Sequence, residues 1–163
     1  MTNTSEGGSR RTVRGGSRRG RGGNSALEMS LLLPILLALA FGLVEFGQYM
    51  YIKHCFEAAA RDAMRVAVMS SATQAQVSSV LTTTLGQANV TYNSSWLTIT
   101  DLGPTNTGSV SNVATVPSGD ELQLTLSARY STIPCAVRPL STMTGIGVGS
   151  NTNVVGVCTM VKE

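Results

Sequence analysis

The sequence is poor in the residues from which most active sites are built. Its 163 residues include one histidine, His54, three cysteines and one tryptophan, and charged residues make up 13%. A lone histidine cannot supply the further ligands of a metal centre or the paired groups of a catalytic site. The stretch "GIGVG" after Thr144 lacks the preceding strand and following helix of a nucleotide-binding motif. We therefore predict a non-enzyme without cofactor or metal, in which His54 is a polar residue near a membrane interface.

Positive charge is concentrated at the N-terminus. Residues 1–23 hold six arginines and one acid, which gives +5, whereas the remaining residues sum to −2. Such an arginine-, glycine- and serine-rich segment buries too little apolar surface to fold, so we predict a disordered leader. Arginine-glycine segments can bind RNA, but no aromatic residue for base stacking precedes Phe41. We predict no nucleic-acid partner, and favour a topological role over a solubility tail: arginines before an apolar span hold that end in the cytoplasm.

No charged residue occurs between residues 29 and 44. Extending this apolar run to about residue 52 reaches the roughly 20 residues that cross a bilayer. Tyr49 and Tyr51 then lie where aromatic residues anchor a helix at the membrane interface. We predict a transmembrane helix over about residues 29–52 and a single pass through the inner (cytoplasmic) membrane, with all later residues outside.

Two alternatives use the same segment differently. A basic leader, a short apolar run and the triplet Ala38-Leu39-Ala40 also describe a secretory signal peptide, which would release a soluble protein that starts at Phe41. Apolar residues continue beyond Ala40 as far as Phe46, which argues against that cleavage. The other alternative is an uncleaved single-pass protein whose outer domain binds a ligand.

Two acids accompany the apolar run. Glu28 stands at its start, where an ionisable group costs a few kcal/mol unless it has a partner. If the chain were cut after Gly23, the new α-amine of Asn24 would lie four positions before Glu28, on the same helix face. Glu45 has two interpretations: it reaches water at the outer interface, or it pairs with a basic group such as Lys53 in another subunit.

The same residues resemble a known family. The segment "RGGNSALEMSLLLP" resembles the cleavage site of type IV pilin precursors, with glycine at the cut and glutamate fifth in the product. The block from there to about residue 68 looks like the TadE-like pseudopilins of the tight-adherence pilus. Its matching elements are a proline in the leucine-rich stretch, Pro34, "GLVEFG" at residues 42–47 and "AARDAMR" at residues 59–65.

This resemblance implies a protein that is processed and assembled. It implies cleavage by a prepilin peptidase between Gly23 and Asn24, and packing of the mature helix with other pilin subunits in the membrane or in a pilus used for adhesion or secretion. Glu28 and Glu45 would serve assembly, and Pro34 would kink the helix. Met29 stands where major pilins of this system tend to carry an aromatic residue, which favours a minor pilin.

The predicted fold is α+β. After the leader (residues 1–23), a long helix over residues 24–70 crosses the membrane and becomes amphipathic, with a Glu57–Arg61 pair on its surface. Residues 71–163 form an extracytoplasmic head with a modest core, in which a short helix begins at a Thr73–Gln76 capping box and stops at Gly86. An antiparallel sheet packs on the long helix. Its strands are expected within residues 89–100, 120–131 and 153–163; the middle one alternates most clearly.

The three cysteines give one candidate disulfide. Cys135 and Cys158 both fall in the head, where an oxidising compartment favours their pairing and a stabilisation on the order of 3 kcal/mol. Cys55 is then left over on the long helix. It either packs as a small apolar residue, the interpretation we favour, or links copies of the chain.

Overall fold

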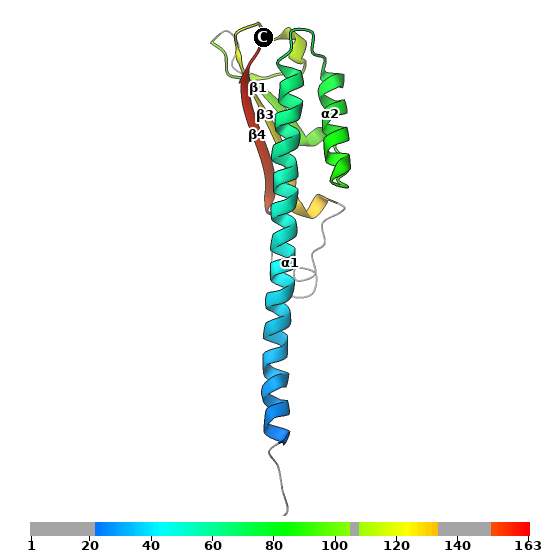
Figure 1. Cartoon of the computed structure of the whole chain (residues 1–163). Helices are drawn as coiled ribbons and strands as arrows, with labels where there is room; N and C mark the ends of the chain where they lie inside the picture. The colour runs from blue at the N-terminus through cyan, green and yellow to red at the C-terminus, as the bar shows by residue number, and fades with distance from the viewer. Residues whose placement is uncertain (1–21, 105–107, 134–150) are drawn as a thin grey trace, which may run out of the picture. The chain divides into compact units, whose positions relative to one another are not determined.

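The computed structural model describes residues 22–104, 108–133 and 151–163. In these residues the fold is α+β, as predicted, with two α-helices and a four-stranded antiparallel sheet (Figure 1). The chain divides into two compact units, Met1–Leu36 and Leu37–Glu163. Most of the predicted leader and Cys135 lie outside the described residues, so leader disorder and the Cys135–Cys158 disulfide stay predictions.

Helix α1, Gly22–Ala67, is the longest element and runs on through Pro34. The proline therefore does not end the helix, and a kink there stays a prediction. Within the first unit the large apolar side chains are exposed; Leu27 and Leu31 keep 71% and 73% of their surface. In the described part of the chain one helix, Ser25–Ala67, is long and apolar enough to cross a membrane.

The later part of α1 belongs to the second unit and buries one face in its core. Phe56 and Met64 are fully buried there, as are the small residues on the same face, which recur at helical spacing. The predicted amphipathic character of this part of the helix is confirmed, although Val66 is only partly buried. The buried positions on this face are Ile52, Phe56, Ala59, Ala60, Ala63, Met64 and Ala67.

Helix α2, Gln74–Gln87, begins as the sequence predicts. The Thr73 side chain accepts a hydrogen bond from the Gln76 N–H, and the Gln76 side chain accepts one from the Thr73 N–H at 2.9 Å. The helix runs one residue beyond the predicted stop at Gly86, to Gln87. The helix ends at a Schellman motif: Asn89 takes the left-handed conformation with φ of 60°, and the Val90 N–H reaches the Leu85 carbonyl at 3.0 Å.

Replacing Thr73 by alanine should lower the free energy of unfolding by about 1 kcal/mol, because the Gln76 N–H at the helix start loses the side-chain oxygen that accepts from it. Thr83→Ala, at an exposed position inside the same helix, is the matched control and should be neutral or slightly stabilising. Denaturant unfolding of the full chain in detergent, followed by fluorescence of Trp96, measures both. Equal effects of the two substitutions would show that the capping box contributes nothing.

The sheet has the order β2-β1-β3-β4. Its strands are β1 (Leu97–Asp101), β2 (Gly108–Ser109), β3 (Glu121–Arg129) and β4 (Asn153–Val161), and all described pairings are antiparallel. The alternation predicted for β3 is confirmed, because its even-numbered residues are buried and its odd-numbered ones are not. Tyr130 is buried as expected but begins a 3₁₀-helix, Tyr130–Thr132, rather than continuing the strand.

The first predicted strand is shorter than the sequence suggested. Asn89 stands in a turn, and Asn93 caps a 3₁₀-helix, Ser94–Trp96, by accepting a hydrogen bond from the Ser95 N–H. The Asn93 side chain satisfies a backbone group locally, and Asn89 takes the left-handed conformation; both compete with strand formation. Pairing with β3 therefore starts only at Leu97.

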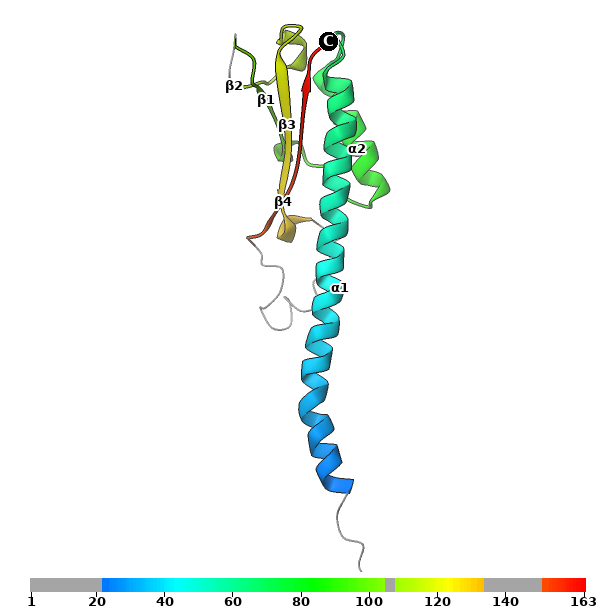
Figure 2. The ribbon, with the colours of Figure 1, turned by 60° about the vertical axis from the view of Figure 1, so that its left-hand side comes forward.

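In the second unit the sheet packs closely on α1, and β4 runs alongside the helix in both views (Figures 1 and 2). The two elements approach closely at Gly156: a Cβ added there would lie 2.4 Å from the backbone oxygen of Phe56. Only glycine fits at this distance, so Gly156 sets how near the strand comes to the helix. The ring of Trp96 covers Phe56 from the sheet side, with ring centroids 5.8 Å apart.

Candidate functional site

The predicted processing site lies in the first turn of α1. The structure places Gly23 and Asn24 inside the helix, directly after Gly22. Two adjacent glycines make this turn a poor helix, because each costs about 1 kcal/mol relative to alanine. The first four N–H groups of any helix also lack intrahelical partners. The turn is therefore the part of α1 that unwinds most readily.

Glu28 follows one helical turn after Asn24. Its side chain is exposed, and the apolar residues around it are exposed too. Positions 24 and 28 are four residues apart on one continuous helix, which places them on the same face, as the sequence predicts. Its proposed role in assembly stays a prediction.

An exposed apolar band follows Glu28 along α1. None of the residues in the most apolar stretch of this helix is buried. An apolar surface of this size is unfavourable in water. It is typical of a helix that contacts lipid or other apolar helices. Its large exposed side chains are Leu27, Met29, Leu31, Leu32, Leu33, Ile35, Leu36, Leu37, Leu39, Phe41, Leu43, Val44 and Phe46.

The burial of Glu45 contradicts one of the two interpretations that the sequence allowed. The sequence suggested a carboxylate that reaches water at the outer interface, but the side chain is only 1% exposed. Position 45 belongs to the second unit, which begins at Leu37, so it shares in the burial of that unit rather than in the exposure of the first. A role of Glu45 in assembly stays a prediction, and any such role would start from a buried carboxylate.

Glu57 organises the charged face of α1 beyond the apolar band. Its carboxylate lies 3.8 Å from the Arg61 guanidinium, which confirms the predicted pair, and 4.0 Å from the Lys53 ammonium. The ring of His54 is 3.9 Å away on the other side and is largely exposed. In the described residues no group of three potential metal ligands comes together.

The sequence of α1 matches the model of a protein family described as TadE-like protein. Residues 23–65 match the TadE-like protein family. The resemblance inferred from the sequence is confirmed over this segment, which starts at the glycine of the predicted cut. No curated protein and no solved structure matches the chain.

The match covers about a quarter of the chain and shows a likeness to the TadE-like protein family over residues 23–65. The matched segment comprises most of α1, so the likeness rests on the helix that holds Glu28 and the apolar band. The match ends at residue 65, before α2 and the whole sheet, which therefore lie outside it.

The described cysteines do not pair with each other. Cys55, on the TadE-like helix, and Cys158, on β4, are both half-buried and not bonded to one another. Cys158 faces the helix side of β4, since the even-numbered residues of this strand are the more buried ones. A link between copies through Cys55 stays a prediction.

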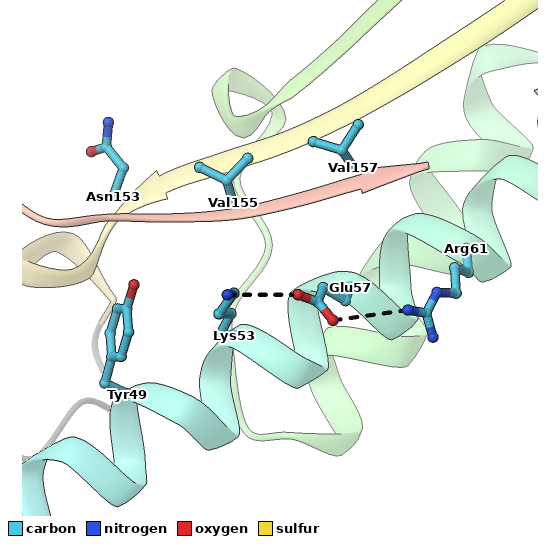
Figure 3. A pocket seen from close by; sticks show the side chains of 7 residues that line it. All are labelled: Tyr49, Lys53, Glu57, Arg61, Asn153, Val155 and Val157. Atoms are coloured by element: carbon cyan, nitrogen blue, oxygen red, sulfur yellow. Dashed lines mark ion pairs between the residues drawn. The ribbon is translucent and has the colours of Figure 1, made fainter. Parts of the chain in front are cut away.

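The structure also reveals a groove that sequence reasoning missed, between the TadE-like helix and β4 (Figure 3). We call it the α1–β4 groove; its volume is about 580 Å³. The helix contributes Tyr49, Lys53, Glu57 and Arg61, and the strand contributes Asn153, Val155 and Val157. The valine-rich stretch "NVVGV" predicted a strand here, but the sequence did not indicate that this strand lies at the edge of the sheet.

Proposed function

We propose that this protein is a minor pilin of a Tad-type pilus, made as a precursor and cut by a prepilin peptidase between Gly23 and Asn24. The observation that carries the proposal is the apolar band of α1, a long uncovered helix surface within the segment that matches the TadE-like family. Such a surface suits a helix that first lies in lipid and then packs among other pilin helices.

The arginine-rich leader supports the orientation of the precursor. Its net charge of +5 directly precedes the apolar band, and excess arginine marks the cytoplasmic side of a membrane helix. The leader would remain in the cytoplasm, while the second unit with α2 and the sheet would fold outside. The glycines at the start of α1 would let the peptidase unwind and reach the scissile bond.

Glu28 supports the assembly step. After cleavage, the positively charged α-amine of Asn24 would lie one turn away, in the same subunit or in a neighbouring one. A carboxylate and an amine that neutralise each other cross an apolar environment at far lower cost than either charge alone. The pair would therefore let the mature helix leave the bilayer and enter the fibre.

The head gives the subunit its position in the pilus. A minor pilin of this kind would initiate or cap a fibre used for surface attachment or secretion, with its sheet facing outward. Contacts of the head beyond the helical bundle would then distinguish this subunit from the major pilin.

The N-terminus of the mature protein tests the proposal. The full-length gene product, isolated from cells with an active prepilin peptidase, should begin at Asn24 when its intact mass is measured. A chain that begins at Met1 or Thr2 would indicate an uncleaved single-pass membrane protein with a ligand-binding outer domain. One that begins at Phe41 would indicate an exported soluble protein, and either result would overturn the pilin assignment.

A further inference from the structure

We propose that the α1–β4 groove is a docking site for an extended strand of a partner protein, which pairs with the edge of β4 and carries acidic side chains toward α1. The groove lies wholly within the second unit and outside the apolar band. The inference therefore goes beyond assembly through the helix and does not depend on cleavage at Gly23.

The backbone of β4 offers the pairing edge. The Tyr130 N–H binds the Thr152 carbonyl, and the Lys162 N–H binds the Asp120 carbonyl, so the even-numbered residues of β4 face β3. Hydrogen-bonding direction alternates along a strand, so the N–H and C=O groups of residues 153, 155, 157, 159 and 161 point the other way. Because β4 ends the described sheet, these groups lie at its open edge, which is the usual site of strand addition.

The spacing of the helix side chains matches a strand in this position. Tyr49, Lys53, Glu57 and Arg61 follow each other every four residues, or about 6 Å along a helix. Side chains on one face of a strand repeat every two residues, or about 6.6 Å. Since β4 runs alongside α1, a strand added to β4 would place successive inward side chains opposite successive residues of this row (Figures 2 and 3).

The charges of this row indicate that the partner strand carries acidic side chains. One carboxylate, Glu57, lies between the cations Lys53 and Arg61, whose side chains remain 42% and 64% exposed. The row therefore keeps a net positive charge, and inward acids opposite Lys53 and Arg61 would be complementary. These two residues are eight apart on the helix, which corresponds to acids four apart on the strand. A second copy docking edge to edge would instead bring two positive rows together.

The outward face favours apolar neighbours. Val155, Val157 and Val161 point outward from β4 and are 37%, 48% and 58% exposed. Opposite them on β3 stand polar residues, namely Ser127, Thr125 and Glu121. A row of β-branched residues on the added strand would cover the valines as cross-strand neighbours. The partner segment thus alternates outward valine-like residues with inward residues that include two acids.

The test uses the full-length protein in detergent micelles and a labelled peptide, Val-Glu-Val-Thr-Val-Glu-Val. Its two glutamates have the required spacing, and its threonine faces Glu57. Fluorescence anisotropy should show saturable binding, about tenfold tighter than for the same peptide with lysine in place of both glutamates. Failure to bind at about 1 mM peptide would overturn the proposal.

Two variants at position 157 distinguish strand pairing from nonspecific binding of the peptide. Val157→Pro removes an N–H that points to the open edge and leaves the bonds to β3 intact, a site where an edge strand tolerates proline. It should weaken peptide binding at least about tenfold. Val157→Thr keeps the N–H and the β-branched shape at this half-exposed strand position, and should bind within about twofold. Unchanged Trp96 fluorescence in both variants shows that the head is folded, and equal binding by both would overturn the proposal.

The double variant Lys53→Glu, Arg61→Glu tests the charge assignment. It should reverse the preference, so that the lysine peptide binds tighter than the glutamate peptide. If both peptides bind this variant as they bind the original protein, the row on α1 does not face the peptide, and the proposed mode of docking is wrong.

Discussion

Replacing Glu28 by glutamine should remove most of this protein from assembled pili while leaving it in the membrane. The substitution keeps the size and hydrogen-bonding capacity of the side chain but removes its charge. The Asn24 α-amine would then enter the helical bundle without a counter-ion, at a cost of a few kcal/mol. Since each 1.4 kcal/mol is a factor of ten, incorporation should fall by about tenfold to a hundredfold.

Quantitative immunoblotting of sheared pili against the membrane fraction measures this effect. Glu28→Asp, which keeps the carboxylate, should retain part of the incorporation. Glu121→Gln, the same change at an exposed position of β3, is the matched control and should behave as the original protein. Glu28→Gln protein that is cut at Gly23 and found in pili at the normal level would show that the proposed pairing is wrong.

Gly156→Ala should destabilise the head by about 3 kcal/mol. The new methyl group would lie 2.4 Å from the Phe56 backbone oxygen, and a helix backbone cannot turn aside as a flexible side chain can. Either β4 moves away from α1, which exposes the core, or both elements are strained; overpacking of this kind costs about 1–3 kcal/mol. Because the contact is with the backbone, we expect a loss of stability near the upper end of this range.

Gly86→Ala is the matched control, because a Cβ at Gly86 has nothing within 4 Å and the residue lies inside α2. Alanine is the better helix former, so this change should stabilise the head by about 0.5–1 kcal/mol. Trp96, the one tryptophan of the chain, lies against Phe56 and reports the loss of the helix–sheet contact. A Gly156→Ala midpoint equal to that of the original protein would contradict the close packing.

Elements that local physics determines were predictable from the sequence. The capping box of α2 needs only residues three apart, and the alternation of β3 needs only a two-residue period, so both patterns are visible without knowledge of the fold. The apolar band and the acid at its start are likewise properties of one continuous segment. The TadE-like match covers that same segment. The predictions about the roles of Glu28 and the helix are therefore more specific than those about the rest of the chain.

Features that depend on distant parts of the chain were not predictable. Whether Glu45 meets water or is buried depends on how the second unit folds over that part of α1, which no local pattern encodes. The α1–β4 groove requires that β4, near residue 157, lie beside residues 49–61, and the order of strands in a sheet cannot be read from their alternation. The end of α2 was misplaced for a smaller reason: asparagine as well as glycine adopts the left-handed conformation.

The contact between Gly156 and Phe56 also constrains when the head can form. These residues are 100 positions apart in the sequence, and β4 is the last of the described strands along the chain. Until β4 is made, β3 has one bare flank and the buried face of α1 lacks part of its cover. Closure of the head therefore waits for the synthesis of β4, and the chain without β4 is the species most exposed to aggregation.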